Sequence, residues 1–110
     1  MLVASGVPSE IAGRVLACVD ERMKQSILQL YRSARNIGAE WHADVDTIAR
    51  PGLVIWGRDD PFVPVRFGER LASRVGAELV VFDQCGHWWP TQRPRDAARA
   101  LEQFWSRTTS

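Results

Sequence analysis

Two short runs of apolar residues, Leu53–Trp56 and Leu79–Phe82, constrain the fold of this chain more than any other feature. A run that is apolar at every position predicts a strand buried on both faces of a sheet. The residues between the runs carry an apolar side at helical spacing, made of Phe67, Leu71 and Val75. A helix that joins two such strands predicts a right-handed crossover, with the strands parallel and their carboxyl ends on one rim. The expected helix spans residues 65–75 and ends at Gly76.

Amphipathic helices are expected before and after this unit. Pro8 suits the first turn of a helix, because the N–H that it lacks has no partner there. Asp20 can cap a second helix, and Gly38 is expected to end it. The apolar positions are Ile11, Val15, Leu16 and Val19 in the first helix and Met23, Ile27, Leu30, Tyr31 and Ala34 in the second. Residues 39–50 are expected to form a connector, and Pro94 is expected to begin the last helix.

Two strands are too few for an independent sheet of this kind. Two-stranded units are marginally stable, and the inner strand would leave a row of backbone N–H and C=O groups unpaired. Five Trp residues are also more than such a small core can easily bury. Length and composition, 110 residues of which 45% are hydrophobic, would permit one globular domain, so the objection comes from topology. We therefore expect either a missing N-terminal half or a partner chain that pairs with the open edge.

A proton-handling residue follows each apolar run. The segments concerned are Gly57-Arg58-Asp59-Asp60-Pro61-Phe62-Val63-Pro64 and Cys85-Gly86-His87-Trp88-Trp89. A carboxylate followed later by a histidine is the order of the second and third members of the Ser…Asp/Glu…His triad of α/β-hydrolases. The stretch from Arg50 to Trp105 resembles the C-terminal part of an α/β-hydrolase-fold enzyme. Residues 28–34 more weakly resemble the helical sequence before the acid strand in some members.

The resemblance implies a fold and two catalytic roles. The fold class is α/β: the C-terminal part of a mostly parallel α/β-hydrolase sheet, in β-α-β-α order, preceded by two amphipathic helices. Residues 50–110 would be this part of the core, and residues 1–49 a helical segment for which an origin in a cap is one interpretation. Asp60 would be the acid and His87 the base. Members include esterases, lipases, peptidases, epoxide hydrolases and haloalkane dehalogenases, so the resemblance names no substrate.

Asp59 is the rival of Asp60 for the role of acid. In the family the acid usually stands three residues after the glycine, which favours Asp60, although either carboxylate could instead cap a helix or form an Asx turn. Both loops should lie on one rim of the sheet. A carboxylate oxygen of Asp60 should then lie roughly 2.6–3.2 Å from an imidazole nitrogen of His87. His42 has no such context and is expected in the connector.

The nucleophile of the triad is not found in the sequence. No G-x-S-x-G segment occurs, and Ser26, Ser33 and Ser73 all fall in expected helices. Cys85 is an alternative nucleophile, but side chains two residues apart rarely align for a hydrogen bond with each other. The missing group could also be an aspartate, as in dehalogenases and epoxide hydrolases of this fold. Trp88 is a candidate substrate-binding residue; with Trp89 it could equally fill space against the last helix.

Composition narrows the classes of partner. A net charge of +1 indicates no attraction to nucleic acid or membranes, and no apolar run approaches the ~20 residues of a membrane span. Two cysteines and no recognisable signal peptide favour a cytoplasmic setting. No metal-binding spacing or phosphate-binding glycine loop occurs, so no cofactor is expected.

We expect a hydrolase that supplies the acid and the base of a triad, acts on a small-molecule substrate, and is inactive as this chain alone. A non-enzymatic module that pairs its open sheet edge with another chain is the main alternative. A decayed coding remnant is a third interpretation.

Overall fold

The computed structural model describes residues 2–108 of the chain. Two strands form the sheet, β1 (Leu53–Gly57) and β2 (Glu78–Phe82). The helices before them are η1 (Val3–Ser5), α1 (Ser9–Ala17), α2 (Glu21–Ser33), η2 (Ala34–Asn36) and α3 (Ile37–Val45). The helices after β1 are α4 (Val65–Val75), α5 (Trp89–Gln92) and α6 (Pro94–Thr108). Among the described residues, no helix has both the length and the apolar character needed to cross a membrane.

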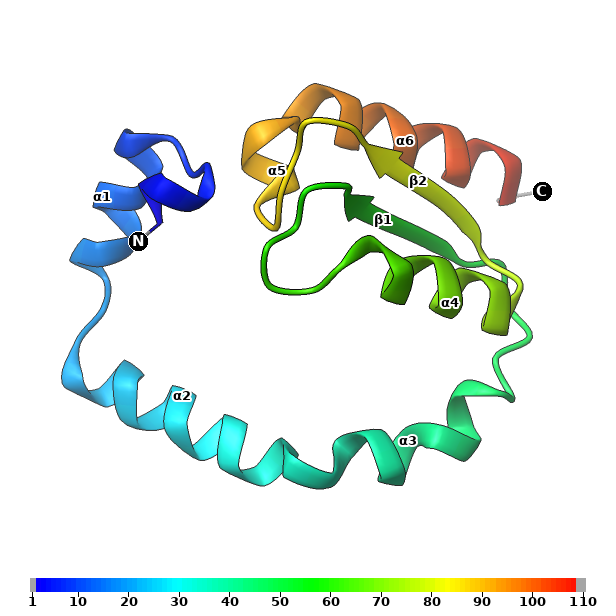
Figure 1. The fold of residues 1–110 in the computed structure, drawn as a ribbon, viewed down its shortest axis with the longest axis horizontal. Coiled ribbons are helices and arrows are strands. Elements are labelled where there is room, and N and C mark those ends of the chain that lie inside the picture. The colour runs from blue at the N-terminus through cyan, green and yellow to red at the C-terminus, as the bar shows by residue number, and fades with distance from the viewer. Residues whose placement is uncertain (1, 109–110) are drawn as a thin grey trace.

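The two strands are adjacent and parallel, which confirms the parallel pairing predicted from their apolar runs. The register pairs Leu53 with Glu78 at one end and Gly57 with Phe82 at the other. Both strands therefore end at the same rim. The helices α4 and α6 flank the strands on opposite sides (Figure 1). The sheet thus has the layered arrangement expected of an α/β fold.

Small residues let α4 approach the sheet closely. Gly68 and Ala72 are the buried residues of this helix. A Cβ atom on Gly68 would lie 2.7 Å from the ring of Trp56 in β1, so only glycine permits this distance. Phe67 and Leu71, which share the apolar side predicted from the sequence, are exposed instead. Gly76 ends the helix in the left-handed conformation, with φ of 64°, as its position predicts.

The segment before the first strand differs from the sequence-based expectation. Gly38 does not end a helix, and residues 39–50 are not all connector, because α3 runs from Ile37 to Val45 and includes both Gly38 and His42. Gly38 is absent from the glycines with positive φ, which shows that it keeps an ordinary helical conformation. A glycine inside a helix costs only about 0.5–1 kcal/mol, and no proline follows until Pro51. The prediction of a stop at this position was wrong for that reason.

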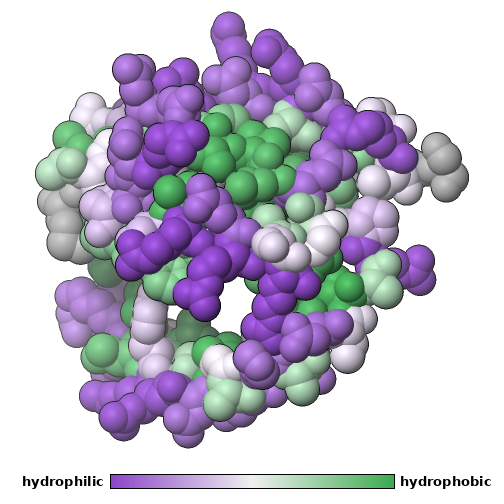
Figure 2. All heavy atoms as spheres, turned by 45° about the vertical axis from the view of Figure 1, so that its right-hand side comes forward, coloured by the Kyte–Doolittle hydropathy of each residue, from purple (hydrophilic) through white to green (hydrophobic). Residues whose placement is uncertain are grey.

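The helices α2 and α3 form an arm that stands away from the sheet (Figure 1). Every residue of α2 is exposed, including the apolar side predicted for it, with Tyr31 at 74%. The arm is held at its far end, where Arg74 of α4 donates to the carboxylate of Asp46 at 2.5 Å and to the carbonyl of His42 at 2.6 Å. Figure 2 shows an opening through the molecule that the arm borders.

The buried hydrophobic residues are few and small. Those in the described part of the chain are Val7, Ala12, Ala72, Cys85 and Ala97. The accessible surface is 8633 Å², whereas a folded monomer of 12.4 kDa is expected to expose about 6,100 Å². The radius of gyration is 16.3 Å, against about 13 Å for a compact domain of this length. The fold is therefore an open one whose apolar helix faces lack cover.

Candidate active site

The loop after β1 is folded around the carboxylate of Asp60. One oxygen, Oδ1, accepts hydrogen bonds from the backbone N–H groups of Phe62 at 2.8 Å and Val63 at 2.9 Å. The indole N–H of Trp56 donates to the carbonyl of Val63 at 2.9 Å. The last residue of β1, Gly57, accepts from the N–H of Asp60 at 3.3 Å. The loop is thus a tight Asx-type turn anchored to the strand that it leaves.

The loop after β2 runs against the first loop. The backbone N–H of Asp59 donates to the carbonyl of Cys85 at 2.9 Å. A Cβ atom on Gly57 would collide with the carbonyl oxygen of Gly86, so a glycine is required where the two loops meet. Gln84 adopts the left-handed conformation, with φ of 53°, which turns the chain back at this point. Cys85 and Gly86 are consequently buried.

This packing brings Asp60 and His87 together. The second carboxylate oxygen, Oδ2, lies 2.9 Å from Nδ1 of His87. The distance falls in the range expected from the sequence. The side chain of Asp60 is only 6% exposed and that of His87 is 42% exposed. The carboxylate is therefore enclosed, while the imidazole remains partly open to solvent.

The carboxylate of Asp60 is held in its charged form. Partial burial by itself would raise the pKa of this group, because it disfavours the charge. Hydrogen bonds from the backbone of Val63, from the imidazole of His87 and from the backbone of Phe62 outweigh that effect and hold the pKa below its ordinary value. An ionised carboxylate can only accept, so Nδ1 of the imidazole is the atom that carries the proton of this contact.

Aromatic rings fix the plane of the imidazole. Phe62 and Trp88 meet the His87 ring edge to face, with centroids 5.2 Å and 5.5 Å away. A hollow of about 160 Å³ beside the pair is lined by Ile55, Trp56, Gly57, Asp60, Val63, His87 and Trp89. Trp89 thus lines this hollow, whereas Trp88, the candidate substrate-binding residue, contacts the imidazole itself. The indole nitrogen of Trp88 is buried with no hydrogen-bond partner among the described residues.

The other candidates from the sequence lie outside this pair. Asp59 is exposed, and the contact with His87 is made by Asp60 alone of the two acids. Cys85 is 1% exposed, and burial raises the pKa of its thiol, which opposes a role as nucleophile. Ser26, Ser33 and Ser73 lie in α2 or α4, as expected. The hydroxyls of Ser26 and Ser33 donate to carbonyls within their own helix.

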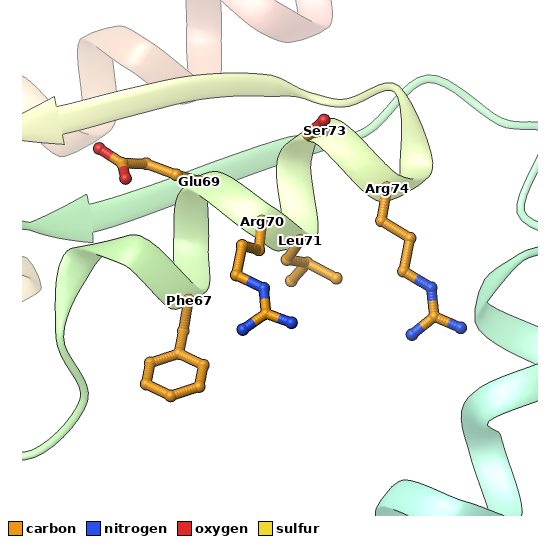
Figure 3. A pocket seen from close by; sticks show the side chains of 6 residues that line it. All are labelled: Phe67, Glu69, Arg70, Leu71, Ser73 and Arg74. Carbon is orange, nitrogen blue, oxygen red and sulfur yellow. The ribbon is translucent and has the colours of Figure 1, made fainter.

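A hollow larger than the one beside the pair lies on the outer side of α4. It has a volume of about 640 Å³ and is lined by Phe67, Glu69, Arg70, Leu71, Ser73 and Arg74. Figure 3 shows Phe67, Arg70 and Arg74 pointing away from the strands, toward the opening. This hollow contains neither Asp60 nor His87, so its size does not mark it as the reaction site.

Comparison with known proteins relates the chain to a family of enzymes. The model of the alpha/beta hydrolase family matches residues 4–100 of the chain. A crystal structure of MGS-MChE2, an alpha/beta hydrolase enzyme from a sediment metagenome of the Mar Chica lagoon in Morocco, superposes with a TM-score of 0.68. The superposition covers 93% of this chain and 47% of that chain at 23% sequence identity, which supports the fold alone.

Curated relatives are similar over about half of the chain. A 2-hydroxy-6-oxononadienedioate/2-hydroxy-6-oxononatrienedioate hydrolase of Paraburkholderia xenovorans is 60% identical over 58 residues, which are 52% of this chain and 20% of the relative. A 2-hydroxy-6-oxo-6-phenylhexa-2,4-dienoate hydrolase of Comamonas testosteroni is 60% identical over 53 residues, or 47% and 18% of the two chains. The matched region thus spans about a fifth of the length of these relatives.

Proposed function

This chain belongs to the alpha/beta hydrolase family, and we propose that it supplies the acid and the base of a hydrolytic triad whose nucleophile comes from outside residues 2–108. The observation that carries the proposal is the 2.9 Å contact between Asp60 and His87, at the rim where β1 and β2 both end. A contact of this kind between an enclosed carboxylate and a partly open imidazole is the geometry that general base catalysis needs.

The chemistry follows from the protonation of the pair. Because Nδ1 of His87 holds the proton shared with Asp60, the lone pair of the imidazole resides on Nε2. That nitrogen can accept the proton of a hydroxyl nucleophile as it attacks, and later return it to the leaving group. The charged carboxylate of Asp60 keeps this tautomer and stabilises the imidazolium that forms between the two steps.

The relatives suggest a substrate class. Their names describe hydrolysis of 2-hydroxy-6-oxo derivatives of dienoic or trienoic acids, which carry either a second carboxylate or a phenyl group. We extend that class to this chain as part of the proposal. The partly apolar hollow beside His87, with Ile55, Val63 and Trp89 in its lining, is compatible with a conjugated carbon chain.

The nucleophile requires a partner segment, and the open fold supports one. Both strands have an outer edge without a neighbouring strand among the described residues. An additional parallel strand beside this sheet would bring its own carboxyl end to the rim that carries His87. The alternative function, a non-enzymatic module that pairs its open edge with another chain, rests on the same edge and differs only in lacking catalysis.

A complementation experiment separates these two functions. The 110-residue chain would be co-expressed with the Paraburkholderia hydrolase truncated before the segment that this chain matches, and the pair isolated by copurification. We expect the pair to hydrolyse 2-hydroxy-6-oxononadienedioate, and His87→Ala or Asp60→Asn to lower the rate by roughly 10²–10⁴-fold. His42→Ala, in α3, is the matched control and should leave the rate unchanged. A copurified pair whose rate is insensitive to His87→Ala contradicts the proposal.

The chain alone should show no hydrolase activity, because among the described residues no serine, threonine or cysteine lines the hollow beside His87. The measurement is turnover of the same substrate by the purified chain, with free imidazole at equal concentration as the reference. Turnover well above that reference, and abolished by His87→Ala, would show that the chain holds a nucleophile of its own. Loss on Cys85→Ser would then identify it.

A further inference from the structure

The loop that carries His87 is held by a residue that no part of the triad argument uses. The side-chain oxygen of Gln92 accepts a hydrogen bond from the backbone N–H of Gly86 at 2.9 Å and from the thiol of Cys85 at 3.4 Å. Both donors belong to the two residues directly before His87. Because both partners are donors, the oxygen and not the nitrogen of the amide must face them.

The short helix α5 ends at Gln92 and places its side chain beside the residues that precede His87. The carbonyl of Trp88 accepts from the N–H groups of Thr91 at 2.9 Å and Gln92 at 3.0 Å, which closes a single turn directly after His87. The turn reverses the chain, so that Gln92 returns to the residues that precede the histidine. A catalytic candidate and the group that fixes its backbone are thus close neighbours in the sequence.

The loop is held on two sides. On the side of β1, the carbonyl of Cys85 accepts from the N–H of Asp59 at 2.9 Å. On the side of α5, the N–H of Gly86 donates to Gln92. The backbone entering His87 is therefore fixed by one hydrogen bond on its carbonyl side and another on its amide side. The first also joins this loop to the loop that carries the acid.

A third element presses the amide of Gln92 into place. A Cβ atom on Gly6 would collide with Nε2 of Gln92, so the turn after η1 is packed directly against this side chain. Gly6 has φ of 93°, a conformation that glycine adopts readily. A side chain at this position would require the amide group of Gln92 to shift, and the backbone of any residue other than glycine would be strained at this φ.

From these contacts we infer that Gln92 is a positioning residue for the proposed triad. It holds the residues 85–86 backbone so that the imidazole of His87 meets Asp60 with Nε2 free. The inference rests on the proposed function for its catalytic consequence, and on the hydrogen bonds of Gln92 for its structural one. The two parts can be tested separately.

The structural part is tested by hydrogen–deuterium exchange of the purified chain, measured by mass spectrometry on peptides from the His87 loop and from α4. We expect Gln92→Leu, which removes the acceptor, to accelerate exchange of the loop peptide roughly fivefold while the α4 peptide is unchanged. Gln92→Glu keeps an acceptor oxygen and should preserve the protection. Equal acceleration in both peptides would mean a general loss of stability and would overturn the inference, as would no change in either.

A pair of glycine variants tests the same contact from the other side. Gly6→Ala should reproduce the effect of Gln92→Leu on the loop peptide, because the new methyl group displaces the amide. Gly76→Ala is the matched control for the loop peptide, since Gly76 also has a positive φ, of 64°, and nothing lies within 4 Å of a Cβ atom at that position. A loop peptide that exchanges normally in Gly6→Ala contradicts the role assigned to the packing of Gly6.

The catalytic part is tested in the copurified pair. Gln92→Leu should lower kcat by about tenfold to a hundredfold with little change in KM, since a small misplacement of a base costs rate and not ground-state binding. Gln92→Glu should restore most of kcat. If His87→Ala has no effect, the proposed function fails whatever Gln92 does. If His87→Ala abolishes turnover and Gln92→Leu does not, only the positioning role fails.

Discussion

Asp60 divides its two carboxylate oxygens between two tasks. Oδ1 accepts the backbone N–H groups of Phe62 and Val63 and so shapes the loop, while Oδ2 meets Nδ1 of His87. The turn that is formed by one oxygen therefore orients the other. A carboxylate fixed in this way loses little further conformational freedom when it holds the imidazole, and the same hydrogen bonds keep it charged.

The lowered pKa of Asp60 predicts a dependence of stability on pH. A group whose pKa is depressed by folding stabilises the fold fully above its unfolded pKa, about 3.9 for aspartate, and loses that contribution as the pH falls through the folded value. Asp60→Asn should therefore be less stable than the parent chain at pH 6, and the difference should shrink below about pH 4. Urea unfolding of the two chains at one protein concentration measures the stability difference at pH 6 and its decrease at lower pH. A stability difference that stays constant as the pH falls from about 6 to about 2.5 would show that the charge of Asp60 does not stabilise the fold.

The meeting point of the two loops predicts a severe effect at Gly57. Gly57→Ala would bring a methyl group into the carbonyl oxygens of Cys85 and Gly86, which are backbone atoms and cannot rotate away. We expect a loss of roughly 1–3 kcal/mol in unfolding free energy and separation of Asp60 from His87. Gly38→Ala has open space around it in α3 and should be neutral or stabilising. Equal stability of the two variants would show that the loops can part without cost.

At the scale of elements, the helix α2 of the arm gains little stability from packing against the rest of the chain. The residues of α2 are exposed throughout, so its stability comes from its ends and its own backbone. Its clearest end signal is Asp20, whose carboxylate accepts from the N–H of Met23 at 2.7 Å. The helix α4 differs, because Gly68 and Ala72 are buried against the strands. The loss of a single hydrogen bond within the helix should therefore reduce the stability of α2 more than that of α4.

Removal of the cap tests this contrast. Asp20→Ala should destabilise the first turns of α2 by roughly 1 kcal/mol, because one helix N–H loses its acceptor. Hydrogen exchange in peptides from α2 should then accelerate, while peptides from α4 exchange as before. Asp20→Asn is the control, since asparagine is also a strong cap. Faster exchange in α4 as well would show that the arm and the sheet unfold as one unit.

At the scale of the whole molecule, the fold exposes more surface than a monomer of its mass should. The excess over the expected value is about 2,500 Å², within the range of one side of a large obligate interface. Large hydrophobic side chains are exposed on this surface, among them Phe67 on the outer side of α4 and Leu30 and Tyr31 along the arm. Large exposed apolar surfaces favour association with another chain or segment.

The isolated chain is therefore expected to associate instead of remaining a stable monomer, so its variants are compared at one protein concentration. Sedimentation velocity should show a concentration-dependent mixture of species, and near-ultraviolet circular dichroism of the five Trp residues should be weak. The copurified pair should instead sediment as one species and give a stronger near-ultraviolet circular dichroism signal, because a partner covers the exposed faces. A monodisperse monomer with a sharp thermal transition would contradict the interpretation of the open fold.

Local sequence determined the elements whose residues act on near neighbours. The apolar runs specify β1 and β2, and Gly76 ends α4 by a conformation that its own backbone permits. The parallel crossover then follows from chirality, and with it the rim shared by Asp60 and His87. The contact between these two residues is thus a consequence of short-range patterns combined with a general rule of handedness.

Only the tertiary structure decided features that depend on what surrounds a residue. Gly38 could end a helix or continue one, and the balance of small energies in α3 selects continuation. The apolar side of α4 could be buried or open, and Phe67 is exposed because small residues bring the other side against Trp56. Gln92 carries no signal of its role in the sequence, since the donors that it accepts from meet it only after α5 has turned the chain. Patterns along a chain report local preference, whereas burial and long-range hydrogen bonds arise only when separate segments come into contact.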